Sequence, residues 1–340
     1  MMMCKQVHAP VMHIRMHFQC HPHKEKVVVV MGATGAGKSR LSIDLATRFR
    51  AEIINCDKMQ VYEGLDIVTN KITDEECDCV PHHLLGLVDP ETNFTAENFV
   101  SAATLALKSI VGRGKLPIIA GGSNSFIEAL VNDEKYEFRS RTCLLTSKLI
   151  AIMDRYNVCF LWVDVAMPVL QQFVSERVDR MVATGMLKEV KNLYNPNMDY
   201  SKGIRRAIGV AEFDSYCRAL YSSSTNEKTR AMLLESAIKE TKINTCKLAR
   251  RQVEKIYRLR DVKGWKIHQL DATKAFLKQG TSGAEEAWAE QVARPASVIV
   301  QEFLYNFNHY RSFATGGREP QMARHRVNKL TSFEHITIAR

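Results

Sequence analysis

Residues 27–39 read Val-Val-Val-Val-Met-Gly-Ala-Thr-Gly-Ala-Gly-Lys-Ser, and this stretch decides the fold class. A run of β-branched residues predicts a buried strand, and the glycines with the final Lys-Ser complete a phosphate-binding loop (P-loop). In such a loop the backbone N–H groups wrap an anion, the lysine adds charge, and the serine hydroxyl can ligate Mg²⁺. An amphipathic helical pattern follows at once, as this motif requires. We therefore predict that a di- or triphosphate is bound by the loop residues Gly32, Ala33, Thr34, Gly35, Ala36, Gly37, Lys38 and Ser39.

The composition is that of an ordinary globular protein, with 46% hydrophobic and 25% charged residues among 340. No apolar run approaches the length of a transmembrane helix, so we expect no membrane insertion. Nine scattered cysteines do not form a disulfide framework and fit a reducing compartment. The net charge of +10 suits an anionic partner, either a phosphorylated small molecule or RNA, and does not choose between them.

Short apolar runs alternate with helical patterns along the first half of the chain. This alternation is typical of an α/β fold, here a P-loop parallel sheet with flanking helices and a smaller helical lobe. Because Pro117 has no N–H for a strand ladder, it should lie at the very start of its strand. The predicted strands are 27–31, 52–55, 116–120 and 159–165, and the predicted helices between them are 38–49, 95–112 and 123–131.

Changes of pattern divide the chain into five segments. Residues 1–24 contain no acid and are either a targeting arm or a disordered basic leader. Residues 25–165 form the P-loop α/β core, and 166–227 are helix-rich with no convincing strand, which predicts the helical lobe. Residues 228–306 predict a long basic helix, a late strand and a closing helix that returns to the core. The polar tail 307–340 is predicted to be disordered.

Three polar residues follow predicted strands, where parallel sheets bind ligands. Asp57 is a metal-binding acid or a general base, unless it only caps the following turn. Gln60 can offer its amide to the edge of a base such as adenine. Ser123 begins a helix whose amides could hold a ligand, although a strand-to-helix turn needs an N-cap serine in any case. The pair His82-His83 is interpreted as part of a structural loop.

Basic residues recur in the second half of the chain. Arg177 and Arg180 lie one helical turn apart, and Arg205-Arg206 lie in a glycine-flanked turn. Such arginines suit bidentate phosphate contacts, but solvated surface charges are the competing interpretation. The same two interpretations hold for a basic stripe on the long helix, formed by Lys247, Arg251, Lys255 and Arg258.

Eight motifs occur together in one order along the chain, at 32–39, 53–62, 64–71, 80–86, 121–127, 160–165, 206–209 and 244–252. Two of these motifs have the sequences Ile-Ile-Asn-Cys-Asp-Lys-Met-Gln-Val-Tyr and Asn-Thr-Cys-Lys-Leu-Ala-Arg-Arg-Gln. Together they resemble the isopentenyltransferase family, which prenylates the N6 amine of adenine. They are more similar to the plant adenylate isopentenyltransferases, the cytokinin-synthesising branch, than to the tRNA-modifying branch.

The resemblance implies that the P-loop holds the pyrophosphate of dimethylallyl diphosphate rather than an ATP to be hydrolysed. Thr34 would donate a hydrogen bond to the leaving oxygen, while Lys38, Ser39 and Mg²⁺ take up the pyrophosphate charge. Asp57 would accept the N6 proton as the amine attacks the allylic carbon.

The resemblance also implies a role for two basic residues. Arg206 matches the family's diphosphate-contacting position, and Arg206 and Lys255 are candidates for gripping the β- and γ-phosphates of the acceptor. Two departures stand out: the stretch 139–157 looks longer than in plant members, and Cys79 replaces a common glycine, which could strain a turn of positive φ.

Three functions remain open. The first is prenylation of a free adenine nucleotide (ATP, ADP or AMP), for which we expect a monomer in the plastid, or otherwise in the cytoplasm. The second is the same chemistry on tRNA, which we do not expect because no cysteine follows Cys246 to build a C-terminal Cys2His2 finger. The third is a nucleotide kinase or a non-catalytic P-loop binding protein.

Overall fold

The computed structural model describes residues 24–131, 156–197 and 199–305. The leader 1–24, the stretch 139–157 and the tail 307–340 lie almost entirely outside the described residues.

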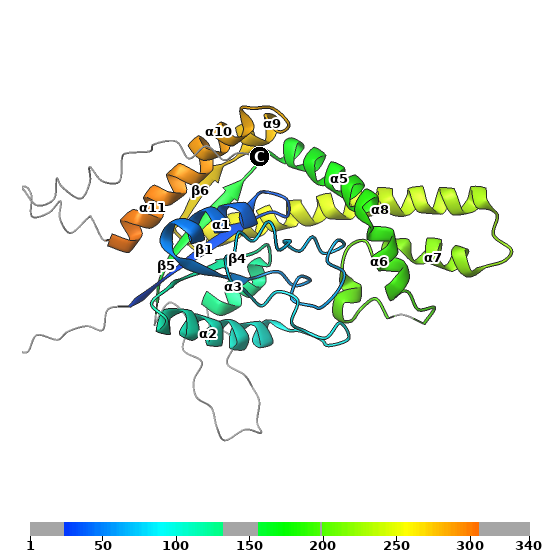
Figure 1. Cartoon of the computed structure of the whole chain (residues 1–340), viewed down its shortest axis with the longest axis horizontal. Helices are drawn as coiled ribbons and strands as arrows, with labels where there is room; N and C mark the ends of the chain where they lie inside the picture. The colour runs from blue at the N-terminus through cyan, green and yellow to red at the C-terminus, as the bar shows by residue number, and fades with distance from the viewer. Residues whose placement is uncertain (1–23, 132–155, 198, 306–340) are drawn as a thin grey trace, which may run out of the picture.

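A six-stranded sheet, with every neighbouring pair parallel, forms the centre of the molecule (Figure 1). The strand order is β3-β2-β4-β1-β5-β6. The predicted α/β class is confirmed. The strands are β1 (Glu25–Gly32), β2 (Ala51–Asn55), β3 (His82–His83), β4 (Leu116–Ala120), β5 (Tyr156–Asp164) and β6 (Ile267–Asp271).

Helices cover both faces of the sheet and continue beyond it. They are α1 (Lys38–Phe49), α2 (Ala96–Gly112), α3 (Asn124–Val131), α5 (Met167–Thr184), α6 (Met186–Leu193), α7 (Asp214–Tyr221), α8 (Glu227–Tyr257), α9 (Thr273–Leu277), α10 (Ala284–Trp288) and α11 (Arg294–Tyr305). The closing helix predicted at 285–306 is present as an unbroken helical run from α10 to α11, within which a π-helical turn occupies Ala289–Ala293.

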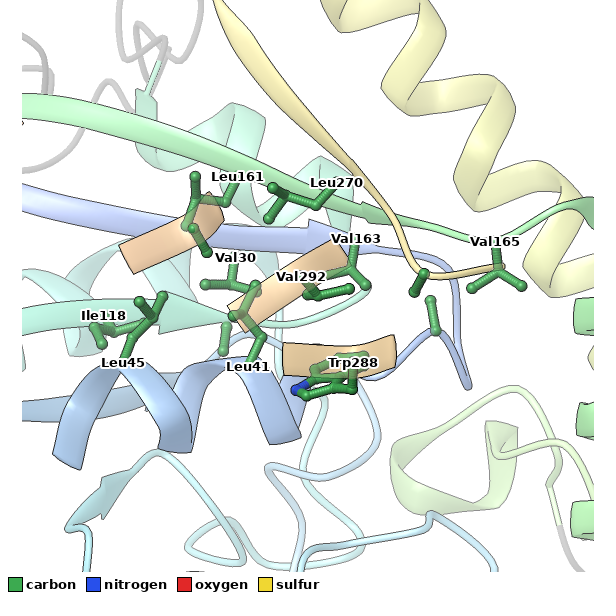
Figure 2. Close-up of a cluster of buried hydrophobic side chains, with 14 of the residues drawn as sticks. Val30, Leu41, Leu45, Ile118, Leu161, Val163, Val165, Leu270, Trp288 and Val292 are labelled. Carbon is green, nitrogen blue, oxygen red and sulfur yellow. The ribbon is translucent and has the colours of Figure 1, made fainter. Parts of the chain in front are cut away.

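Alternation along β1 divides the core into two layers. Val28 and Val30 point toward α1, α10 and α11, whereas Val27 and Val29 point toward α2 and α3. All four side chains are 0–1% exposed, as expected for a central strand with both faces covered. Figure 2 shows the first layer, in which Val30 lies among side chains from α1, β5 and the closing helices.

The described part of 166–227 contains helices and turns and no strand. Its helices α6 and α7 pack with the first half of α8 around a third apolar cluster, away from the sheet (Figure 1). Fully buried members of this cluster include Tyr62, Met186 and Phe213. Since Tyr62 belongs to the segment after β2, that segment joins the sheet to the helices.

Two expectations concern the segment between β2 and α2, of which the first is corrected and the second is borne out. His82–His83, interpreted as loop, form the edge strand β3, which is too short to leave a periodic signal. Cys79 has φ of 57°, so the turn does require the left-handed conformation that the replaced glycine would adopt without strain.

A buried carboxylate ties this edge of the sheet together. Glu52 is 3% exposed, and its carboxylate accepts hydrogen bonds from His83 Nε2 (2.7 Å), from Arg113 and from Lys115 Nζ (3.0 Å). Burial acts to raise the pKa of Glu52, but the hydrogen bonds from His83, Arg113 and Lys115 outweigh it and lower the pKa to about 2.

The P-loop is braced by a residue from the far end of the chain. Trp288 is 3% exposed, and its indole N–H donates to Asp44 Oδ2 at 2.8 Å. The Arg40 guanidinium lies 4.5 Å from the centre of the same ring. A Cβ at Gly37 would lie 2.7 Å from the indole, so the loop and the ring are in close contact.

Replacing Glu52 by Gln tests the carboxylate network through pH. Because the folded pKa lies below the ordinary 4.5, the ionised group stabilises the fold above that pH, and this contribution disappears as pH falls toward about 2. At neutral pH we expect Glu52→Gln to lower the free energy of unfolding by about 1–3 kcal/mol. Urea unfolding should show this difference shrinking near pH ~3. A difference that is the same at both pH values, or an equal loss in the exposed control Glu302→Gln, would contradict it.

Replacing Trp288 by Ala tests the brace beneath the P-loop. Removing a buried aromatic side chain leaves a cavity, and we expect a loss of about 3–5 kcal/mol in the free energy of unfolding. Urea unfolding measures the loss. Val298→Ala on the exposed face of α11 is the control, with an expected change within about 0.5 kcal/mol. Similar losses in the two variants would refute the assignment.

Candidate functional site

A cavity of about 910 Å³ opens at the carboxyl ends of β1, β2 and β4. The P-loop forms one wall, the residues after β2 and β4 form the floor, and side chains of α5 and α8 complete the lining next to the P-loop. Ligands of open parallel sheets bind at this edge, where the loops after the strands diverge.

Most of the residues predicted from the sequence surround this cavity. Three loop residues, Gly32, Ala33 and Ala36, are instead buried on the inner side of the P-loop. The predicted residues that line it are Thr34, Gly35, Gly37, Lys38, Ser39, Asp57, Gln60, Ser123, Arg206 and Lys255.

The backbone of the P-loop requires glycine at two of these positions. Gly35 and Gly37 have φ of 81° and 94°, and a Cβ on Gly35 would lie 2.6 Å from Val174 Cγ1. Helix α1 begins immediately after Gly37, so the N–H groups of its first turn have no partner within the helix. The N-terminal end of α1 therefore presents donors and a positive dipole to the cavity.

Two partly buried cations lie at the loop, Lys38 within it and Arg177 next to it. Lys38 Nζ donates to the carbonyl oxygen of Ala33 at 2.7 Å, and burial lowers the pKa of Lys38 to about 8, against the opposing effect of Asp57. Arg177 of α5 donates through one terminal nitrogen to Thr34 Oγ1 at 3.0 Å, and burial lowers its pKa to about 10. Its Nε is buried without a hydrogen-bond partner. Neither cation has an acidic ion-pair partner among the described residues, so an anion would complete this site.

Asp57 lines the cavity and has one of its two oxygens engaged within the protein. Its Oδ1 accepts the N–H groups of Met59 (2.9 Å) and Gln60 (3.4 Å), so the turn-capping interpretation is confirmed for this oxygen. The other oxygen, Oδ2, has no hydrogen-bond partner in the described part of the chain. One carboxylate thus both shapes the turn and retains an acceptor for a ligand.

Gln60 uses its amide nitrogen within the protein. The Nε2 group donates to the carbonyl oxygens of Thr69 (3.1 Å) and Asn70 (2.8 Å), which fixes the segment after residue 64 against the floor of the cavity. Only Oε1 remains to meet a ligand in this arrangement. A contact between Gln60 and a base stays a prediction, now restricted to the acceptor half of the amide.

Three neighbouring basic residues, Lys58, Arg206 and Lys255, also line the cavity and form a basic rim. Arg206 donates through Nε to Gly203 O (3.2 Å) and through a terminal nitrogen to the Tyr62 hydroxyl (3.1 Å). Burial lowers the pKa of Lys58, and repulsion from Lys255 and Arg206 lowers it further. No ion pair with an acid involves these three residues within residues 24–131, 156–197 and 199–305.

Ser123 has a structural role in the same region. Its Oγ accepts the N–H of Lys58 at 3.0 Å, and its backbone precedes α3. This contact links the segment after β2 to the segment after β4, and Ser123 also lines the cavity.

Among the cavity residues outside the predicted set, three carry charge or hydrogen bonds next to the predicted ones: Lys58, Arg177 and Gln252. Arg177 is detectable in the sequence only as one of two arginines at helical spacing, and Lys58 only as the neighbour of Asp57. Gln252 ends the last motif of the chain and contacts the P-loop, as described below.

Two negative findings concern the described residues. They hold no group of three or more His, Cys, Asp or Glu side chains arranged to bind a metal ion. None of their helices has both the length and the apolar character needed to span a membrane.

Comparison with known proteins gives the family. The model of the family described as IPP transferase matches residues 60–149 and 137–256. Adenylate isopentenyltransferase 3, chloroplastic, of Arabidopsis thaliana is 54% identical over 283 residues, covering 83% of this chain and 80% of the relative. Adenylate isopentenyltransferase 7, mitochondrial, of the same plant is 50% identical over 295 residues, covering 86% and 84%.

Solved structures agree on the fold. A eukaryotic dimethylallyltransferase acting on tRNA has a TM-score of 0.67 at 27% identity, with 83% of this chain and 80% of that chain covered. The tRNA isopentenylpyrophosphate transferase of Bacillus halodurans has a TM-score of 0.62 at 24% identity, covering 83% and 100%. The resemblance expected from the motifs is confirmed: with a family model matched over more than half of its length and relatives at 50–54% identity, the chain belongs to the IPP transferase family.

Proposed function

We propose that this chain transfers a dimethylallyl group from dimethylallyl diphosphate to the N6 amine of adenine in ATP, ADP or AMP, releasing diphosphate, as a step of cytokinin biosynthesis. The observation that carries the proposal is the placement of the P-loop and the free oxygen of Asp57 around one cavity. The relatives' names, adenylate isopentenyltransferase, support the same reaction. Most of the names that specify a compartment are chloroplastic, and we infer a plastid protein that acts as a monomer.

The donor half of the reaction uses the P-loop. In the proposed complex the first N–H groups of α1 and the Lys38 ammonium hold the diphosphate. Because Thr34 Oγ1 already accepts a hydrogen bond from Arg177, its own hydrogen is free to be donated to the oxygen that leaves carbon. Fixed donors aimed at developing negative charge are a major source of catalysis, since they need no reorganisation during the reaction.

The acceptor half of the reaction uses the floor and the rim. An aromatic amine is a weak nucleophile, so removal of its proton by Asp57 Oδ2 during attack assists the step by a typical ~10²–10⁴-fold. Arg206 and Lys255, which line the same cavity on the basic rim, would bind the β- and γ-phosphates of the nucleotide. Holding the amine in line with the breaking carbon–oxygen bond raises the rate further, because the loss of translational and rotational entropy occurs on binding and not in the chemical step.

Mg²⁺ fits this donor set as a shared ion. Ser39 is exposed at the cavity and offers one hydroxyl oxygen. Mg²⁺ commonly binds through one or two protein ligands together with phosphate oxygens and waters, which suits a site without an acidic cluster in the described residues. When bound, the ion would offset part of the diphosphate charge.

Prenylation of a tRNA adenine is the second candidate, favoured by the similarity to a dimethylallyltransferase acting on tRNA and by the net charge of +10. A competition assay separates the two. Purified protein, Mg²⁺ and dimethylallyl diphosphate are incubated with equal amounts of ATP and unmodified tRNA, and both products are quantified. We expect prenylated nucleotide. Prenylated tRNA beside unmodified ATP would reject the nucleotide as the acceptor.

Variants of Asp57 and Thr34 test the assigned chemistry. Asn at position 57 keeps the oxygen that caps the turn and loses the base, so we expect Asp57→Asn to lower kcat by about 10²–10⁴-fold with the melting temperature unchanged. Thr34→Ala should lower kcat by about 10²–10³-fold, through loss of a donor to the leaving oxygen.

Matched controls use the same substitutions at exposed positions, Asp261→Asn and Thr281→Ala. These variants should retain wild-type turnover. A Thr34→Ala or Asp57→Asn protein that turns over within about threefold of its control would remove that residue from the mechanism.

A further inference from the structure

Gln252, on the cavity face of α8, connects three segments that are far apart in the sequence. Its side-chain carbonyl Oε1 accepts the backbone N–H of Thr34 at 2.7 Å, and its Nε2 donates to the backbone carbonyl of Gly122 at 2.9 Å. Its own backbone carbonyl accepts a hydrogen bond from Asn124 Nδ2 at 2.9 Å. With 7% exposure, the side chain is shielded from water that would compete for these bonds.

The hydrogen bond to Thr34 has a specific effect on the P-loop. It takes up one backbone N–H that would otherwise be available to an anion, so Gln252 directs the Thr34 amide away from the diphosphate. Arg177 holds the other end of the same residue through Oγ1. Thr34 is therefore fixed from two helices, α8 at its backbone and α5 at its hydroxyl.

Gly122 shows how tightly the Gln252 amide fits. A Cβ on Gly122 would lie 2.3 Å from Nε2 and 3.2 Å from Cδ of Gln252. An added methyl group would therefore displace the amide that holds Thr34. Gly122 and Gln252 therefore depend on each other: because Gly122 has no side chain, the Gln252 amide has room to pack against it.

We propose that Gln252 is a positioning residue for group transfer: with the space left by Gly122, it sets the Thr34 backbone so that the hydroxyl meets the leaving oxygen. The proposal rests on the proposed function. It concerns the rate of transfer more than the capture of diphosphate, because Gln252 uses an amide that does not face the anion and leaves Lys38 and the N-terminal end of α1 unchanged.

The test compares three variants: Gln252→Met, Gly122→Ala and the double variant. Methionine keeps the length of the side chain and removes both hydrogen bonds. We expect either single change to lower kcat by about 10- to 100-fold, as for an ångström-scale misplacement of a catalytic group. The dissociation constant of the protein for inorganic diphosphate in the presence of Mg²⁺, measured by titration calorimetry, should stay within about threefold of the wild-type value. The double variant should lose no more than the worse single variant, because both changes break the same contact.

Matched controls are Gln172→Met on the exposed side of α5 and Gly112→Ala, where a Cβ meets nothing within 4 Å. Both should retain wild-type kcat. If Gln252→Met does not fold, Gly122→Ala still displaces the amide and carries the test.

Three results would overturn the proposal: kcat within about threefold of wild type, losses that multiply in the double variant, or diphosphate affinity that falls in step with kcat. Failure of both variants to fold would likewise assign the contact to stability alone. A wild-type protein that forms no prenylated nucleotide would reject the proposed function instead, so the two failures are distinguishable.

Discussion

Positive charge without an ion-paired acid among the described residues, at the carboxyl edge of the sheet, is the constraint on which the rest of the structure depends. Lys38 and Arg177 are held beside the P-loop with no acidic partner among the described residues, and burial lowers the pKa of both. Such an arrangement costs folding free energy unless an anion enters. Both side chains are held by the loop itself, Lys38 through the Ala33 carbonyl oxygen and Arg177 through the Thr34 hydroxyl.

The site is assembled from segments that meet only in the folded chain. Thr34 follows β1, Asp57 follows β2, and Gly122 follows β4, which the sheet order brings to one edge. Arg177 and Gln252, which lie 143 and 218 residues after Thr34, reach this edge from helices α5 and α8. The helices α5 and α8 therefore do more than shield the site from water, since one side chain of each sets the conformation of the phosphate-binding loop.

Local signals predict the fold well and long-range contacts poorly. β-branched runs and the glycine pattern locate β1, β4 and the P-loop to within a residue or two, because strand propensity and positive φ are properties of the residues themselves. The edge strand His82–His83 and the π-helical turn after α10 were missed, since neither leaves a periodic pattern. The partners of Gln60 and Gln252 could not be predicted either, because an amide's orientation is decided by carbonyl groups that only folding brings near.

The packing of Trp288 against Gly37 has a consequence for what a shortened chain can do. The glycine loop follows β1, whereas the indole that packs beneath it follows β6, the last strand of the sheet in sequence. A fragment that ends at β5 therefore keeps the sequence of the loop and loses the ring that packs against it. The anion pocket thus belongs to the folded chain and not to the loop and its neighbouring strands alone.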